Sequence, residues 1–370
     1  MRFLHSADWQ IGMKARHVGR AGDAVREARL EAARRVIDVA RERGAAFVVL
    51  AGDTFEDNAV DRVLVQRVVD VLAKSSVPVY VLPGNHDPLV PGSVFDHPAW
   101  TTPAARAVVT VLRDASPIRA PGATLWPCPL SEKTGSKDPT AAIPPPAAPP
   151  DLAEIRVGIA HGTLEGVGVD VEEEFPIPLD AAERRRVDYL AIGHWHSTFV
   201  APGSGRVAYS GTHETTKFGE RDSGNVLLVE IDAPGAAPRV ETIRTGSLAW
   251  RQERRELLSA ADVDAVRRDL EALPDPDRTL VHLVLSGALG VDALAATERL
   301  DEILAARFRF GRVDREKLVL APGDASWVAA LPAGPVQAAA RRLAAAGDDD
   351  AVAREALVRL FRFSREGVAS

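Results

Sequence analysis

The chain has 370 residues, of which 46% are hydrophobic and 26% are charged, and a formal net charge of −7 at pH 7. This length favours two domains, and the hydrophobic content is sufficient for a full core. The negative charge disfavours binding of nucleic acid by bulk electrostatics alone. No apolar run is long enough to span a bilayer, no signal-peptide core is visible, and Cys128 is the only cysteine. We therefore expect a cytoplasmic protein without disulfides or membrane contact.

The first part of the chain alternates predicted strands with predicted helices. Apolar runs predict strands at residues 2–7, 46–51 and 77–82, and helical spacing predicts helices at about 23–43 and 61–73. Because the connections are short, this order predicts parallel strands in a layered α/β domain.

The middle of the chain contains a proline-rich tract at residues 135–150, which we expect to be an exposed loop inserted into the same domain. Further strands are expected at about 107–112, 123–127, 155–160 and 188–193, and a short helix near 180–186. Residues 207–210, 224–231 and 240–245 are expected to be antiparallel strands of a second sheet. His213 lies between two of them and is a minor candidate for a metal ligand.

Five of the predicted strands end in Asp, Asn or His. These strand ends are Asp8, Gly52-Asp53, Gly84-Asn85-His86-Asp87, His161-Gly162 and Gly193-His194-Trp195-His196. Open α/β sheets bind ligands beyond the carboxyl ends of their strands, and these side chains suit hard-to-borderline divalent metals. A single such end is equally compatible with a turn that carries a surface histidine, whereas five together indicate a metal site.

The character of the sequence changes beyond about Trp250. Helices are expected at 261–272 and 292–307, strands at 279–286 and 312–320, and terminal helices at 335–346 and about 350–363. The last helix carries an apolar stripe, which either packs within its own domain or docks a partner protein.

The order of the five strand ends resembles the signature of the calcineurin-like metallophosphoesterases over roughly residues 1–230. The resemblance implies an α/β sandwich of two β-sheets flanked by helices. We expect this catalytic domain at residues 1–250, a small α/β cap-like domain at 251–330 and C-terminal helices at 331–370 that are candidates for partner docking.

The resemblance also implies two divalent metal ions, with Mn²⁺ favoured over Fe²⁺ or Zn²⁺. The implied ligands are Asp8, Asp53 and His196 for one ion, and Asp53, Asn85, His161 and His194 for the other. His86 is implied as the catalytic residue that stabilises the transition state and protonates the leaving oxygen. Asp87 either orients His86 or caps the turn. Since residues two apart share a face of a strand, the ring pair His194 and His196 fits this division only if both rings lie on one face or the backbone leaves strand geometry.

Two positions depart from the DNA-nuclease branch of this family. That branch usually has Asp-Xaa-His in the first block, where this chain has Asp8-Trp9-Gln10, and it often has a histidine where this chain has Glu56. Gln10 is therefore a candidate ligand through its amide oxygen, the alternatives being an extra water or a hydrogen bond to a loop.

The segment His5-Ser6-Ala7-Asp8-Trp9-Gln10-Ile11-Gly12 resembles the SbcD-like DNA repair exonucleases. The resemblance implies an exonuclease or endonuclease that acts on DNA, with an SMC-like coiled-coil ATPase as partner and a homodimer as the assembly. The basic loop at residues 14–20 is either a solvated loop or a contact for the phosphate backbone. The alternative functions are a phosphodiesterase for cyclic nucleotides or other small phosphodiesters, and a metal-binding scaffold without activity.

Overall fold

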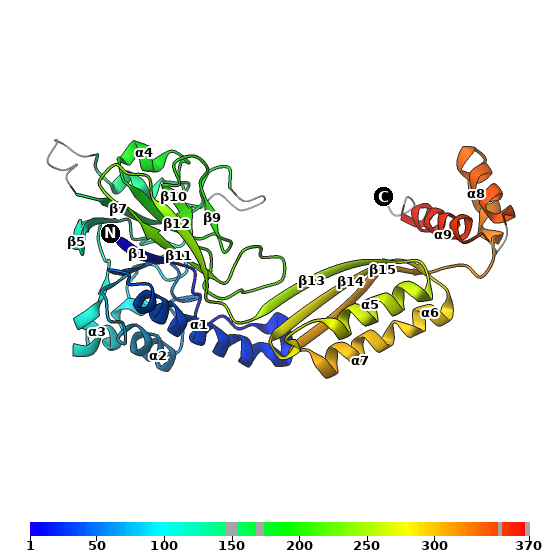
Figure 1. The fold of residues 1–370 in the computed structure, drawn as a ribbon, viewed down its shortest axis with the longest axis horizontal. Coiled ribbons are helices and arrows are strands. Elements are labelled where there is room, and N and C mark those ends of the chain that lie inside the picture. Colours follow the sequence, from blue (N-terminus) through cyan, green and yellow to red (C-terminus); the bar gives the residue numbers. More distant parts are fainter. Residues whose placement is uncertain (146–153, 168–173, 347–349, 367–370) are drawn as a thin grey trace. The chain divides into compact units, whose positions relative to one another are not determined.

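The computed structural model describes residues 1–145, 154–167, 174–346 and 350–366 (Figure 1). The chain divides into two compact units, Met1–Leu248 and Ala249–Ser370. Within the described ranges, every helix falls short of the length or the apolar character that crossing a membrane requires.

The first unit contains two six-stranded sheets within the described residues, ordered β12-β11-β1-β2-β3-β4 and β5-β6-β7-β8-β10-β9. The strands of the first sheet are β1 Arg2–Ser6, β2 Val48–Ala51, β3 Val79–Leu82, β4 Val109–Val111, β11 Asn225–Glu230 and β12 Arg239–Arg244. Those of the second are β5 Ile118–Ala120, β6 Ala123–Pro127, β7 Arg156–His161, β8 Tyr189–Gly193, β9 Phe199–Val200 and β10 Val207–Tyr209. The helices of this unit are α1 Gly22–Glu42, α2 Arg62–Leu72, α3 Pro103–Val108 and α4 Ala181–Arg185.

The strands that lead to the predicted metal ligands are parallel within each sheet. β1, β2, β3 and β4 are parallel neighbours in the first sheet, and β6, β7, β8 and β10 in the second. Their carboxyl ends therefore meet at one edge of each sheet. The predicted α/β sandwich of two sheets flanked by helices is confirmed.

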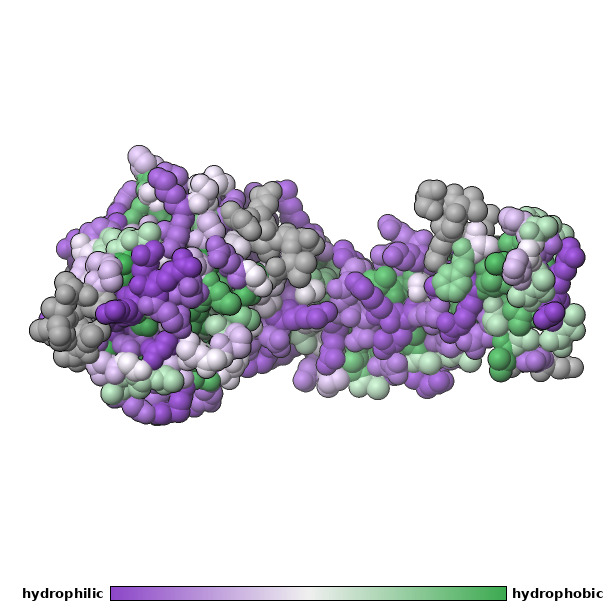
Figure 2. Space-filling view, turned by 90° about the horizontal axis from the view of Figure 1, so that it is seen from above, coloured by the Kyte–Doolittle hydropathy of each residue, from purple (hydrophilic) through white to green (hydrophobic). Residues whose placement is uncertain are grey.

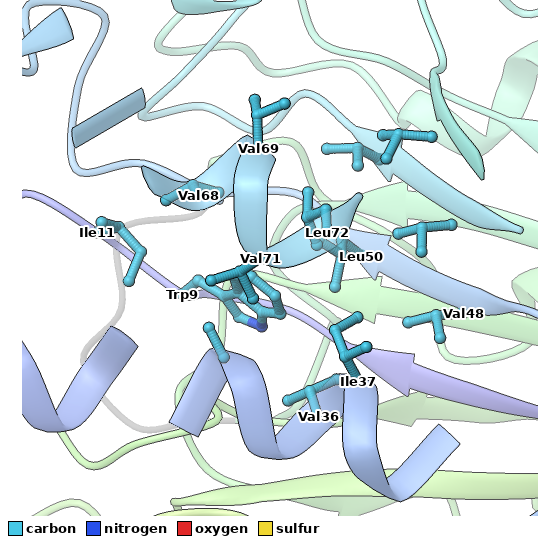
Figure 3. Close-up of a cluster of buried hydrophobic side chains, with 14 of the residues drawn as sticks. Trp9, Ile11, Val36, Ile37, Val48, Leu50, Val68, Val69, Val71 and Leu72 are labelled. Atoms are coloured by element: carbon cyan, nitrogen blue, oxygen red, sulfur yellow. The ribbon is translucent and has the colours of Figure 1, made fainter. Parts of the chain in front are cut away.

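The central strands are buried on both faces, because alternate side chains enter different cores. Along β2, Val48 and Leu50 pack toward α1 and α2 (Figure 3), whereas Val49 and Ala51 join a core with residues of the second sheet. In that inner core the ring of Phe3 packs edge-on against Tyr189 of β8, with centroids 5.7 Å apart. The core therefore joins the two sheets whose strand ends build the site.

The prediction for the last three strands of this unit was wrong in part. Rather than forming one antiparallel second sheet, β11 and β12 extend the first sheet antiparallel to β1, and β10 lies parallel to β8 in the second. An apolar strand can pair with an edge strand of either sheet, and its sequence does not specify which one.

Two local predictions also need correction. The strand expected at 107–112 is shorter, because its first residues belong to the helix α3, which continues to Val108. Thr102 caps this helix and Pro103 begins it. The proline-rich tract is not exposed throughout, since Thr140 and Ile143 are buried. Residues 146–150 of the tract lie outside the described residues.

The second unit is a three-stranded parallel sheet with helices. Its strands are β13 Ala249–Leu257, β14 Thr279–Leu289 and β15 Phe310–Leu320, and its helices are α5 Ala260–Ala272, α6 Val291–Ala296, α7 Glu298–Arg307, α8 Pro335–Ala345 and α9 Ala351–Glu366. β13 was not predicted, because its polar run from Arg251 to Glu256 gives no apolar signal. Arg359 and Arg362 of α9 pair with Glu256 of β13.

Candidate metal centre

The predicted ligands lie at the carboxyl ends of β1, β2 and β3 in one sheet and of β7 and β8 in the other. Backbone hydrogen bonds join these ends to one another. Asp8 N donates to Gly52 O at 3.1 Å, and Gly162 N donates to Gly193 O at 3.2 Å. Asp8 also accepts, through both carboxylate oxygens, from the backbone N–H of His194 at 2.9 and 3.1 Å. The two bonds between His194 and Asp8 connect the second sheet to the first.

The backbone leaves strand geometry abruptly at these positions. Asp8, Asp53 and His194 have φ values of 53°, 51° and 111°, and Gln10 has 39°. Left-handed backbone is uncommon for residues other than glycine, and it gathers at functional sites where the surroundings hold it. His194 has therefore left strand geometry, which was one of the two conditions for the His194 and His196 division.

The centre of the site brings together three acceptor atoms of Asp53, Asn85 and His161. His161 Nδ1 lies 2.9 Å from the carbonyl oxygen of Ala51, which only accepts, so Nδ1 carries a proton. His161 Nε2 then presents its lone pair 2.9 Å from Asn85 Oδ1 and 3.4 Å from Asp53 Oδ2. Acceptors that face one another inside a protein need a proton or a cation between them.

The contact between His161 and Asp53 also shifts the pKa values of both groups. Burial alone would lower the pKa of His161, but the carboxylate of Asp53 outweighs burial and raises that pKa to about 9. Burial likewise would raise the pKa of Asp53, and the His161 ring holds it below its ordinary value. A proton on His161 thus fills the space between the acceptors. A divalent cation would displace that proton, as metals do when they bind.

The donor set fits a divalent metal. Potential ligand atoms of Asp8, Asp53 and His161 all lie within 4.8 Å of one another, and the three residues are buried. Burial lowers the pKa of His194 to about 3, which keeps its ring neutral with a lone pair to offer. Its ring stands nearly perpendicular to that of His161, with centroids 5.4 Å apart. Carboxylate, amide oxygen and imidazole together suit Mn²⁺, Fe²⁺ or Zn²⁺.

His86 lies beside this cluster and is more open to solvent than the buried residues. Its side chain is 41% exposed, and its Nε2 lies 4.0 Å from Asp53 Oδ2. Nδ1 bonds to the carbonyl oxygen of Glu56 at 2.8 Å, and the backbone N–H donates to Asp53 Oδ1 at 2.9 Å. The ring is thus held from one side, with Nε2 toward the cluster.

Asp87 holds the turn rather than His86. One carboxylate oxygen accepts from the backbone N–H of Gly84 at 2.7 Å, and the other accepts from that of Phe55 at 3.0 Å. Both bonds are to backbone, and they connect the loop after β3 to the loop after β2. Of the two alternatives for Asp87, the structure supports turn capping.

Gln10 and His213 differ in their surroundings. Gln10 is nearly buried, and its backbone N–H donates to Asp53 O at 2.9 Å. Its role as a ligand remains a prediction. His213 stacks on Trp9 with ring centroids 4.9 Å apart, and its Nε2 bonds to the carbonyl oxygen of Arg29 at 2.8 Å. Packing and this bond hold the His213 ring in place.

Three residues at the site escaped the sequence analysis, namely Arg29, Glu174 and Glu220. Arg29 is buried on α1, and its guanidinium donates to the carbonyl oxygens of Trp9 and Glu214 at 3.0 and 2.7 Å. A cation on the apolar stripe of a helix, four residues after Val25, was a signal that could have identified it. The two glutamates carry no such signal.

Residues 1–198 match the family model of the calcineurin-like phosphoesterases, which is more than half of the chain. The chain belongs to this family. Calcineurin-like phosphoesterases hydrolyse phosphoesters with divalent metals, so this phosphoesterase is a metal-dependent hydrolase. The predicted resemblance is confirmed at this level.

Two solved structures can be compared with this phosphoesterase. The crystal structure of TT1561 from Thermus thermophilus shares 12% sequence identity at a TM-score of 0.42, over 66% of this chain and 98% of that one. A second crystal structure shares 12% identity at a TM-score of 0.40, over 65% of this chain and 98% of that one. No curated protein matches the sequence.

Gly193→Ala tests how tightly the two sheets enclose the centre. A Cβ at Gly193 would lie 2.0 Å from Ala51 O and 2.8 Å from His161 Nδ1, and so would break the bond that orients the His161 ring. Disturbing such supporting bonds typically lowers metal affinity about 10–100-fold. We expect a loss of this size in Mn²⁺ affinity, measured by calorimetry.

The matched control is Gly290→Ala, because a Cβ there meets nothing within 4 Å. This variant should bind Mn²⁺ as the wild type does. Wild-type affinity in Gly193→Ala would show that the close approach of Gly193 to His161 is not required.

Proposed function

We propose that this phosphoesterase is a two-metal DNA exonuclease or endonuclease of the SbcD-like branch, which acts in DNA repair. The observation that carries the proposal is the first-block segment at residues 5–12, which resembles that branch and contains Asp8 of the metal centre. The segment that follows includes a 3₁₀ helix at Arg16–Ala21 and exposes three cations, Lys14, Arg16 and Arg20. Exposed cations that follow a metal-ligating segment in the sequence suit a substrate with a continuous phosphate backbone.

The residues present would divide two metals between them as the family resemblance implies. Asp8, Asp53 and His196 would hold one ion, and Asp53, Asn85, His161 and His194 the other, with Mn²⁺ favoured. When bound, such a pair activates water and neutralises charge on the phosphoryl group. Asp53 would be shared by both ions; its Oδ2 faces His161, and its Oδ1 accepts from the backbone N–H of His86.

His86 is proposed to protonate the leaving oxygen. Its Nδ1 hydrogen is occupied by Glu56 O, so only Nε2 is available for exchange of a proton with substrate. Its exposure allows substrate contact, which the fully buried His161 does not have.

The proposed partner is an SMC-like coiled-coil ATPase, with a homodimer as the assembly. The terminal helices offer apolar surface for such a partner (Figure 2), including Val352 and Phe363 of α9, which are 78% and 54% exposed. An amphipathic helix with exposed apolar residues suits docking into an apolar groove.

Cleavage of linear duplex DNA tests the proposed substrate. With Mn²⁺ the wild type should degrade it, and Asp53→Asn should abolish cleavage because the bridging carboxylate is lost. Combined Lys14→Ala, Arg16→Ala and Arg20→Ala should weaken DNA cleavage, reduce its salt dependence and spare bis(p-nitrophenyl) phosphate, since each lost phosphate contact lowers the salt slope by about 1. Full activity in excess EDTA would refute the metal mechanism. An equal loss of activity on both substrates in the triple variant would show that these three cations do not contribute to DNA binding.

His86→Ala should separate chemistry from metal binding. General acid catalysis contributes about 10²–10⁴-fold, so turnover should fall by that order. Metal content, measured by plasma mass spectrometry, should stay at the wild-type level because His86 is not assigned as a ligand. If the variant loses metal, His86 is itself a ligand.

Gln10→His tests the position that departs from the branch. An amide oxygen is a weaker donor than imidazole to a borderline metal. The ion held with Asp8 should therefore be the looser one, and activity should rise with Mn²⁺ in two phases. The substitution should tighten the looser phase in calorimetric titration. Identical titrations in both proteins would show that Gln10 does not contact the metal.

A further inference from the structure

Two glutamates outside the ligand set each bond to one predicted ligand that carries no negative charge. Glu220 contacts His196 and Glu174 contacts Asn85. We propose that Glu220 and Glu174 are positioning residues, one for each metal, which fix the atom that its partner presents to the ion. The assignment of one glutamate to each ion rests on the proposed division of ligands.

Glu220 determines which nitrogen of His196 is free. Its Oε1 lies 2.8 Å from His196 Nδ1, and its side chain is only 4% exposed. A carboxylate accepts and does not donate, so Nδ1 carries the proton and Nε2 presents the lone pair. Glu220 is itself held, because Oε2 accepts from the backbone N–H of Thr216 at 2.8 Å and Oε1 accepts from the Thr216 hydroxyl. Thr216 thus holds Glu220 in place, and Glu220 in turn fixes the orientation of the His196 ring.

Glu174 determines which end of the Asn85 amide faces the metals. Its Oε2 lies 3.2 Å from Asn85 Nδ2. Because a carboxylate can only accept, the amide must present NH₂ to Glu174, and Oδ1 is turned to His161 Nε2 at 2.9 Å. Rotating the amide would set two oxygens against each other and remove the oxygen ligand. The backbone carbonyl of Glu174 accepts from Thr163 N at 3.0 Å. This bond ties Glu174 to the segment that follows His161.

The charges of the two glutamates also suit this role. Two divalent ions carry about four positive charges, whereas Asp8 and Asp53 supply only two negative ones. A carboxylate behind a neutral ligand makes that ligand a stronger donor without occupying a coordination position. Glu174 and Glu220 therefore balance the site while leaving room for the substrate.

The test is calorimetric titration of Mn²⁺ into the full chain, with electron paramagnetic resonance to report the coupled Mn²⁺ pair. Glu220→Ala and Glu174→Ala should each weaken one binding phase about 10–100-fold and leave the other unchanged. Their double variant should weaken both phases additively. Glu220→Gln should recover much of the loss, since an amide oxygen can still accept from Nδ1. The controls are Asp222→Asn and Glu165→Gln, which lie near the two glutamates in sequence and are exposed.

Asn85→Asp separates positioning by Glu174 from simple support of the fold. A carboxylate at position 85 presents an oxygen in either orientation, so Glu174→Ala should no longer lower Mn²⁺ affinity in this background. A persistent loss there would overturn the orienting role of Glu174. Wild-type affinity of both phases in Glu220→Ala would overturn the role of Glu220.

The proposed function fails differently. If the wild type binds two ions and the variants show these losses, but DNA is not cleaved, the positioning roles stand and the proposed substrate does not. If DNA is cleaved and all variants bind as the wild type does, the reverse holds.

Discussion

The structure depends on holding acceptor atoms of Asp53, Asn85 and His161 against one another in a buried place. Inside a protein such atoms repel unless a cation or proton lies between them, and a proton on His161, or a divalent cation in its place, fills that role. Left-handed backbone at Asp8, Asp53 and His194 and the close contact of Gly193 with His161 occur at the same strand ends. The chain therefore departs from regular strand geometry where it brings these atoms together.

That requirement also explains why the site needs two sheets. Asp53 and Asn85 come from the first sheet and His161 from the second, and the bond from His161 Nδ1 to Ala51 O joins them directly. The inner core, with side chains from both sheets, supplies the apolar burial that resists separation of the sheets. Loss of packing far from the ligands would therefore loosen the centre.

Three histidines at the centre show how one side chain type serves two purposes. His161 and His86 bond through Nδ1 to backbone carbonyl oxygens, and His196 bonds through Nδ1 to the Glu220 carboxylate. In each case Nε2 is the nitrogen left for chemistry. Burial distinguishes them, because the side chain of His161 is inaccessible to solvent, whereas that of His86 is 41% exposed.

The sequence alone determined the layered α/β class, the family and the set of residues brought to the centre. Each of those residues lies at the end of an apolar strand or within about three residues after it, so local pattern was enough to identify it. Tertiary structure alone decided that β11 and β12 join the first sheet, that Asp87 caps a turn, and that Glu174 and Glu220 stand behind Asn85 and His196. These contacts join residues distant in sequence or depend on which sheet edge is free. A local pattern carries no record of such pairings, since they arise only when the chain has packed.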